Sequence, residues 1–260
     1  MRPSTIGSIN LLPENEKHSI YARYIPSELL AHFGLPAADS GKLQELLKFN
    51  CPPGSSSMEM SLYHELGFED PVLYAHIADT INGQLHVLLY VLNDPDSSRY
   101  DVDRMPDGTP TKFGTLSRNK EAEKSALEAG LAPGQVRRGL RLLGAAITKF
   151  EEFVRSLGQE LYFVEPLYYH NAVLFERYGF SYQVGRRLMD EIHAGFKPDG
   201  RLTRELSRDD PFRRPGASES IRLRSWAIHD GILGKPFTDV TMYKTVGQAA
   251  AVDSTSGLRW

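Results

Sequence analysis

Apolar residues recur at intervals of three and four along the middle of the chain. They are Val136, Leu140, Leu143, Ile147, Phe150, Val154 and Leu157. Because an α-helix turns once every ~3.6 residues, this spacing places them on one helix face. The pattern predicts a long amphipathic helix that ends near Gly158.

A hairpin is expected upstream of this helix. Residues 72–81 and 84–92 are rich in strand-forming side chains, and Asn82-Gly83 between them is the preferred pair for a two-residue turn. Such a turn places His76 opposite Leu89, and it also places Asp79 opposite His86. This pair is open to two interpretations, an acid/base couple or a solvated cross-strand pair.

The segment after the long helix shows strand and helix signals in turn. Residues 161–165 form a short apolar run typical of a buried strand, and Pro166 ends it. A short helix is expected over 171–178, with Gly179 as its stop.

Two further strands are expected at 181–187 and 238–244, with an insertion over 190–236 between them. The insertion is rich in arginine, at Arg201, Arg204, Arg208, Arg213, Arg214, Arg222 and Arg224. It is either a lid that recognises an acidic or phosphorylated group, or a surface appendage whose charges are balanced by acidic residues. His229 and Asp230 are adjacent on a helix and so do not form a ready-made dyad.

The N-terminal residues 1–60 are expected to form a helical lead-in packed on the main body, with serines at 27 and 40 near helix starts. The main domain spans 61–247, and the small polar tail 248–260 is expected to be mobile. Within the main domain, residues 93–130 form an elaborated connection with a helix over 119–129.

Composition limits the possible partners. The 260 residues carry a net charge of −3, which does not attract nucleic acid. No stretch approaches the ~18 apolar residues of a membrane span, and the single cysteine, Cys51, fits a reducing compartment. We therefore expect a cytoplasmic protein, whose oligomeric state the sequence does not indicate. Three nearby aspartates do not match a calcium loop, because Pro106 stands where that loop requires glycine, and no metal site is expected.

The start of the long helix carries the chemistry. Gly139 and Gly144 allow the backbone to approach a ligand closely, and the unpaired amides of a first helical turn attract anions. Arg138 and Arg141 add positive charge. This combination suits a pyrophosphate, although glycine and arginine at a helix start also serve packing and solubility.

The order of these elements resembles the GNAT superfamily of acyl-CoA-dependent N-acyltransferases. Arg141-Leu142-Leu143-Gly144-Ala145-Ala146 is similar to the turn motif of that family, and residues 175–180 are similar to its closing pattern of an aromatic residue, three residues and Gly-Phe. The chain resembles a divergent member with an insertion before the last strand. The resemblance implies an α/β fold with a GNAT-like mixed central sheet flanked by helices.

It also implies the ligands. Acetyl-CoA or another acyl-CoA would be the co-substrate, and the acceptor would be a small-molecule or peptide amine. The residues that would bind the acyl-CoA are Arg138, Gly139, Leu140, Arg141, Gly144, Ala145 and Asn171.

Catalysis would require a base near the amine and an acid near the leaving thiolate. Glu165 and His170 are the candidate bases, and Tyr168 is a nearby phenol. Phe175 stands where many members of the family have a tyrosine acid, and it cannot donate a proton. A non-catalytic binding protein on the same fold is therefore an alternative to an N-acyltransferase, and an unrelated α/β enzyme is a third possibility.

Overall fold

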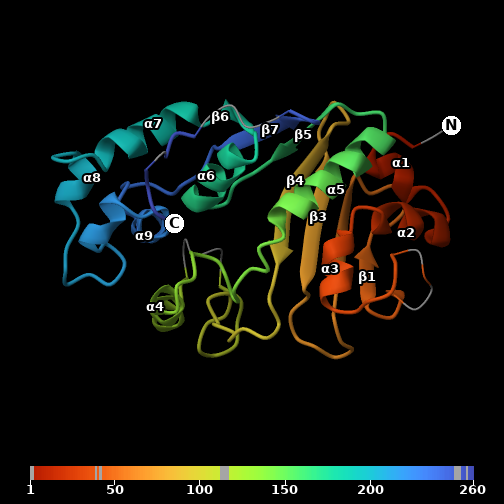
Figure 1. Cartoon of the computed structure of the whole chain (residues 1–260), viewed down its shortest axis with the longest axis horizontal. Helices are drawn as coiled ribbons and strands as arrows, with labels where there is room; N and C mark the ends of the chain where they lie inside the picture. The colour runs from red at the N-terminus through yellow and green to blue at the C-terminus, as the bar shows by residue number, and fades with distance from the viewer. Residues whose placement is uncertain (1–2, 39, 41–42, 112–116, 249–252, 256) are drawn as a thin grey trace. The chain divides into compact units, whose positions relative to one another are not determined.

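The protein has an α/β fold in which helices flank a mixed sheet of seven strands, as expected (Figure 1). The computed structural model describes residues 3–38, 40, 43–111, 117–248, 253–255 and 257–260. The strands are β1 (Leu47–Asn50), β2 (Ser57–Leu62), β3 (Leu73–Asp79), β4 (Leu85–Leu92), β5 (Leu161–Val164), β6 (Ser181–Val184) and β7 (Thr241–Thr245). Their order in the sheet is β1-β2-β3-β4-β5-β7-β6.

The helices group along the chain. The N-terminal ones are α1 (Ile6–Asn10), α2 (Glu14–Ala22) and α3 (Ser27–His32). The later ones are α4 (Lys120–Glu128), α5 (Leu143–Ser156), α6 (Tyr169–Arg177), α7 (Arg186–Gly195), α8 (Arg201–Arg204), the 3-10 helix η2 (Pro215–Ser218) and α9 (Ile221–His229). The N-terminal helical segment and the insertion between the last two strands are both confirmed.

The chain divides into two compact units, which are described separately. Unit 1 comprises the described residues within 1–96, 139–165 and 243–248. Unit 2 comprises those within 97–138, 166–242 and 249–260. The expected boundary at residue 60 falls inside β2, and β1 and β2 both pair in the sheet of unit 1.

The sheet of unit 1 has two chemically different faces. Met58, Met60 and Leu62 of β2 are fully buried on one, which we call face A, whereas Glu59 and Ser61 lie on the opposite face B and are half-buried. This follows from the period of two in a strand, which sends alternate side chains to opposite sides. Apolar and polar residues alternate in β2, so the sequence itself defines face A as the core side.

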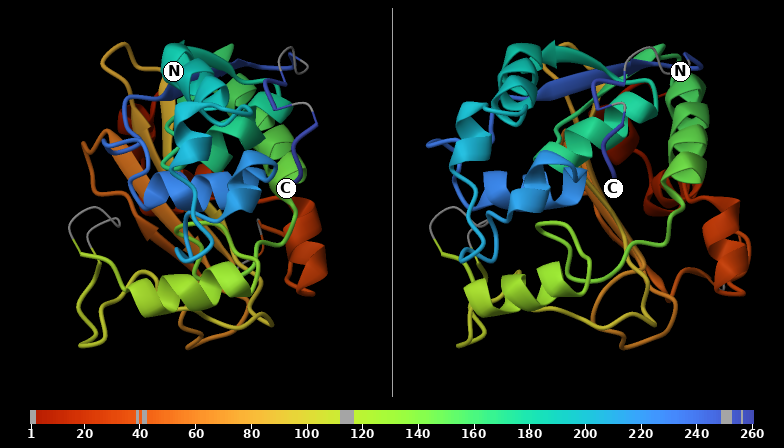
Figure 2. Two further views of the ribbon diagram at one scale, coloured as in Figure 1. Left: turned by 90° about the vertical axis from the view of Figure 1, so that its left-hand side faces the viewer. Right: turned by 60° about the vertical axis from the view of Figure 1, so that its left-hand side comes forward.

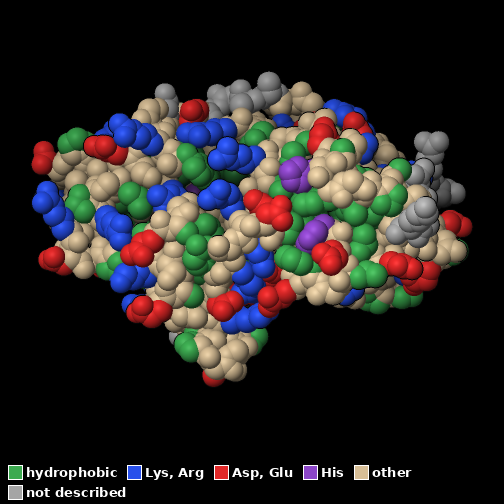
Figure 3. All heavy atoms as spheres, turned by 60° about the horizontal axis from the view of Figure 1, so that its bottom comes forward, with side chains coloured by type: hydrophobic (Ala, Val, Ile, Leu, Met, Phe, Trp, Pro, Cys, Tyr) green, Lys and Arg blue, Asp and Glu red, His purple; other side chains and the backbone are tan. Residues whose placement is uncertain are grey.

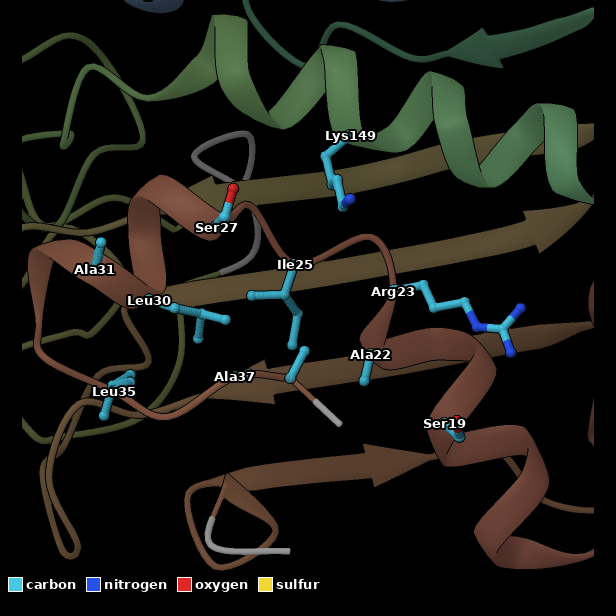
Figure 4. A pocket seen from close by; sticks show the side chains of 11 residues that line it. Ser19, Ala22, Arg23, Ile25, Ser27, Leu30, Ala31, Leu35, Ala37 and Lys149 are labelled. Atoms are coloured by element: carbon cyan, nitrogen blue, oxygen red, sulfur yellow. The ribbon is translucent and has the colours of Figure 1, made fainter. Parts of the chain in front are cut away.

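Helices α2 and α5 and the residues just after α2 supply aromatic side chains that cover face A, and α3 adds the buried Leu29 and Leu30. Tyr24, which follows α2, packs at 5.9 Å from Phe150 of α5, and Phe150 packs at 5.0 Å from Tyr162 of β5. Figure 4 shows α5 and the α2–α3 segment on the same side of the strands. The apolar stripe of α5 therefore has its predicted role, although the helix starts at Leu143, after Leu140.

The predicted hairpin of β3 and β4 is present, but the register predicted next to its turn is wrong. The turn has three residues, because the Thr80 amide donates to the Gln84 carbonyl oxygen at 2.8 Å. Gly83 takes the left-handed conformation with φ of 78°, as such turns require. Ala78, not Asp79, consequently lies opposite His86, and the proposed Asp79/His86 couple does not form.

A β-bulge restores the expected register further along the hairpin. The pairing changes from Ile77 with Val87 to His76 with Leu89, so Leu88 has no partner of its own. The pair of His76 with Leu89 is therefore confirmed, because the longer turn and the bulge shift the register in opposite directions. The bulge lies in the middle of β4.

In unit 2, the connection after β4 and the insertion before β7 share one core. Ala126 and Leu127 of α4 cluster with Phe212 and with Trp226 of α9, and Trp226 is fully buried. Figure 2 shows α4 in yellow-green and α9 in light blue. The insertion is therefore an integral part of unit 2 and not a surface appendage.

Strand β6 is shorter than predicted, because α7 begins at Arg186. Gly185 precedes it with φ of 96°, and a Cβ atom there would lie 2.9 Å from the Cα of Val240. Only glycine fits this abrupt change from strand to helix. The described part of the tail is bonded within unit 2, where Ser254 Oγ donates to Glu176 at 2.5 Å.

Candidate functional site

Strand β5 pairs with only the first part of β4. The two strands pair in parallel at His86 with Phe163 and at Val87 with Val164, and the amide of Glu165 then donates to the Val87 carbonyl oxygen at 3.3 Å. Strand β5 ends at Val164, whereas β4 continues to Leu92. The bulge at Leu88 follows the last of these pairs. We call residues 88–92 of β4, which no described residue of β5 pairs on that side, the unpaired edge of β4.

The turn before α5 meets the end of the unpaired edge of β4. Gly139 forms an antiparallel bridge with Asn93, the residue after β4. Asn93 is buried and its side-chain amide donates to the Pro71 carbonyl oxygen at 3.0 Å, so the bridge is anchored in unit 1. Gly139, four residues before the first residue of α5, is therefore adjacent to the carboxyl end of β4.

The first turn of α5 lacks any side-chain cap. Leu142 occupies the N-cap position without a capping hydrogen bond, and the first turn contains no acidic residue. The first helical bond runs from the Ala146 amide to the Leu142 carbonyl oxygen, so the preceding amides have no acceptor within the helix. Together with the helix dipole, these amides favour a bound anion.

Arg141 has an uncommon backbone conformation for this position. Its φ is 60°, in the left-handed region, whereas Gly139 and Gly144 are not among the residues with positive φ. Its side chain is exposed and forms no ion pair with a described carboxylate. The left-handed residue of the predicted glycine turn is therefore an arginine and not a glycine. Its cationic side chain is available two residues before the first residue of α5.

Of the remaining candidates, Glu165 and His86 are neighbours in unit 1. Glu165 is exposed at the end of β5, and its carboxylate acts electrostatically on His86. Burial lowers the pKa of His86, and Glu165 opposes part of this shift. The Nε2 atom of His86 is buried without a hydrogen-bond partner among the described residues. The sequence named His86 only for the wrong pair.

Tyr168 and His170 come together in unit 2. Their rings stack with centroids 5.7 Å apart, and burial raises the pKa of Tyr168 to about 12. Burial lowers the pKa of His170 to about 3, and its Nδ1 lies 2.9 Å from the hydroxyl of Ser225. A neutral, fully enclosed imidazole of this kind serves packing.

A buried charged cluster adjoins Tyr168 and was not predicted. His229 Nε2 lies 2.9 Å from Glu123 Oε1, Glu123 also accepts from Arg118 at 2.5 Å, and Arg118 donates to Asp230 at 2.8 Å. His229 and Asp230 thus have different partners, which confirms that they are not a dyad. We call Arg118, Glu123, His229 and Asp230 the charged cluster.

The closing helix α6 also belongs to unit 2. Asn171 is half-buried, and its backbone amide donates to the Tyr168 carbonyl oxygen at 3.0 Å. Of the residues predicted to bind acyl-CoA, Arg138 and Asn171 belong to unit 2, whereas the others belong to unit 1. Phe175 packs at 5.0 Å from Phe180. This position therefore contributes an apolar contact within unit 2.

The arginines of the insertion are largely engaged. Arg213 donates to Asp230 at 2.9 Å, Arg201 pairs with Glu205 at 2.7 Å, and Arg224 donates to the Ser218 carbonyl oxygen at 2.8 Å. Figure 3 shows basic and acidic side chains interspersed over one face of the molecule. These contacts favour charge balance over a free cationic lid.

A groove of about 660 Å³ lies elsewhere in unit 1 (Figure 4). It is lined mostly by small and apolar residues of the α2–α3 segment, with Arg23 and Lys149 as its cations. None of the predicted site residues lines it. Lys149 is paired with Glu152 at 2.7 Å, which reduces the positive charge of the groove.

Comparisons with protein-family models, with curated proteins and with solved structures found no match to this chain. Over the described residues, no group of three or more histidine, cysteine, aspartate or glutamate side chains is arranged to hold a metal ion. Within the same residues, no helix is both long and apolar enough to cross a membrane.

Proposed function

We propose that this protein is an acyl-CoA-dependent N-acyltransferase that transfers an acyl group, most simply acetyl, to an amine. The observation that carries the proposal is the unpaired edge of β4, which begins after Val87 and is followed by Asn93, whose bridge partner Gly139 lies four residues before the uncapped start of α5. An extended thioester with an anionic diphosphate at one end has the matching chemistry. Cys51, the only cysteine, is consistent with action in the cytoplasm.

Different residues of unit 1 would bind the diphosphate and the extended chain of the acyl-CoA. The amides of Leu143, Gly144 and Ala145 would hold diphosphate oxygens, and the free guanidinium of Arg141 would add charge. Beyond Val87, the edge of β4 offers backbone groups that have no partner on β5. These groups would hydrogen-bond an extended chain and fix its position.

A direct test uses a substitution that should stabilise the helix and weaken the binding of the ligand. Ala145→Glu places a carboxylate in the first turn of α5, which has no acidic residue now. It should maintain or raise the melting temperature, because the helix dipole favours a negative charge there. By repelling a diphosphate, it should weaken acetyl-CoA binding at least about tenfold.

Calorimetry with acetyl-CoA and longer acyl-CoAs measures this effect. The matched control is Thr148→Glu, an exposed position one turn further along α5, which should retain most of the affinity. If the folded wild-type protein binds no acyl-CoA, the proposal is wrong. Equal affinities for the wild type and Ala145→Glu would place any binding elsewhere.

The second candidate function is ligand or partner binding without turnover. It is favoured by Phe175, which packs against Phe180 and provides no proton. Thioester cleavage with a panel of amines separates the two, because turnover above the uncatalysed rate excludes a purely binding role.

A further inference from the structure

We infer that His86 takes the proton from the acceptor amine and returns it to the departing thiolate. This inference rests on the proposed acyltransferase function. It assigns both proton transfers to one imidazole on β4, in place of the predicted candidates Glu165, Tyr168 and His170. Its basis is the position of His86 just before the unpaired edge of β4, together with its unpartnered ring nitrogen.

His86 lies at the last paired positions of β4 and β5. It pairs with Phe163, and the next pair, Val87 with Val164, is the final one because β5 ends at Val164. Its side chain is on face B, because it lies opposite Ala78, between the face A positions Ile77 and Asp79 of β3. Helices α2, α3 and α5 cover face A, so an amine would approach from face B.

The unpartnered nitrogen calls for a physical explanation. A buried polar atom without a hydrogen bond costs roughly 1–3 kcal/mol, and such atoms are uncommon in folded proteins. Phe163 packs against the imidazole at 6.4 Å without satisfying it. A ligand that hydrogen-bonds to Nε2 would remove this cost, and in this assignment the ligand is an amine beside the unpaired edge of β4.

The surroundings of His86 favour an imidazole that is neutral in the free protein and carries a proton only during the reaction. Glu165 is the charged side chain that acts on it. Face B also carries His76 and Tyr74 of β3 and Glu59 of β2, and Tyr243 of β7 packs against Phe163. The Tyr74 hydroxyl donates to Glu59 at 2.6 Å, so these two groups are paired with each other. A neutral imidazole accepts a proton, and a nearby carboxylate stabilises the imidazolium that results. Glu165 is thus a positioning residue in this assignment.

The reaction then balances without a tyrosine at position 175. The amine lone pair forms a C–N bond to the thioester carbonyl carbon, and the electron pair of the C–S bond leaves on sulfur. One amine proton passes to Nε2 of His86, and the imidazolium gives it to the thiolate. The products are an amide and CoA thiol, with the protein unchanged in charge.

The test compares His86→Gln with His76→Gln, a half-buried histidine on the same face. Calorimetry with acetyl-CoA comes first, and its failure with the wild type would refute the proposed function itself. With binding established, thioester cleavage is followed with water, hydroxylamine and a panel of primary amines. His86→Gln should bind acetyl-CoA within about twofold of the wild type and cleave it about 100-fold more slowly.

Two further measurements separate a proton-transfer role from a structural one. The wild-type rate should fall as pH falls below the His86 pKa, and the acid limb should be absent from His86→Gln. Nitrogen NMR of the imidazole rings should show that acetyl-CoA with a primary amine shifts the His86 signal and leaves that of His76 in place.

Several results would overturn the inference while the proposed function stood. They are an unchanged rate or acid limb in His86→Gln, an equal loss in His76→Gln, or a His86 signal indifferent to acetyl-CoA and amine. Bound acetyl-CoA that none of the nucleophiles cleaves would also overturn it, because His86 would then have no proton to transfer.

Discussion

Two sets of buried polar groups, one in each unit, differ in their hydrogen bonding. In the charged cluster of unit 2, Glu123 accepts from both Arg118 and His229, and the buried charges compensate one another. On β4 of unit 1, His86 Nε2 and the Tyr90 hydroxyl are buried without a described partner. A satisfied network stabilises a single structure, whereas unsatisfied groups remain available to a ligand. Burial and perturbed pKa values alone do not distinguish these cases.

The strongest test of this comparison removes the centre of the charged cluster. Glu123→Ala leaves Arg118 and His229 buried without their carboxylate, which should cost about 3–5 kcal/mol of unfolding free energy. Denaturant unfolding measures the loss. Glu121→Ala, at an exposed position of the same helix, is the control and should change stability little. A loss below about 1 kcal/mol for Glu123→Ala would show that the cluster contributes no stability.

The next effect concerns pH. The pKa of His170 is lowered by burial to about 3, against an ordinary value near 6.5. Below pH ~6.5 the unfolded chain binds the proton and the folded protein does not, so stability falls as pH decreases toward 3. The contribution of this group is at most about 1.4 kcal/mol per pH unit.

His170→Asn should flatten this part of the stability profile and retain a polar atom for Ser225. Denaturant unfolding at pH 7, 6 and 5 provides the measurement. The exposed residue His32 supplies the control, since His32→Gln should leave the slope intact. An unchanged slope in His170→Asn would mean that the imidazole titrates normally.

A smaller effect is expected at Arg141, where stability and binding should move in opposite directions. Its left-handed backbone costs roughly 1 kcal/mol in a residue with a Cβ atom, and glycine removes that cost. Arg141→Gly should therefore raise stability by up to about 1 kcal/mol while it weakens acetyl-CoA binding. Thermal unfolding and calorimetry of one preparation measure both. Lower stability with unchanged binding would contradict this account.

The smallest effect is predicted for Tyr90. Its hydroxyl has no described partner, so Tyr90→Phe loses no hydrogen bond and should change stability by less than about 1 kcal/mol, in the stabilising direction. The buried Tyr21, whose hydroxyl donates to Asn10 at 2.6 Å, is the contrasting position. Tyr21→Phe should destabilise, and a similar loss at Tyr90 would reveal a hidden partner.

Local patterns predicted the elements of this fold well. The apolar stripe of α5, the helix expected over 119–129 and the run at 161–165 each depend on neighbouring residues, which a sequence displays directly. The helix expected near Ser40 was not found in the described residues beyond 42, because Leu47 already begins β1. Competing strand pairing decided that segment.

The site was less predictable, because it depends on contacts distant in the chain. Nothing local indicates that β5 pairs with only two residues of β4, or that Glu123 meets His229 across 106 positions. The importance of His86 follows from a turn one residue longer than Asn82-Gly83 suggests. The exposed Ile81 beside that pair was the available signal, since it occupies the turn itself.

Because of the bulge at Leu88, the alternation of side chains between faces A and B shifts by one residue along β4. Before it, the three-residue turn determines which side chains face the core, and after it the alternation is offset by one. Deleting Leu88 alone would leave His86 in place and move Tyr90 to face B. If the strands instead paired across a two-residue turn at Asn82-Gly83, Asp79 would lie opposite His86 and the histidine would face the core. The orientation of His86 thus depends on the length of the turn, and that of Tyr90 depends on the bulge.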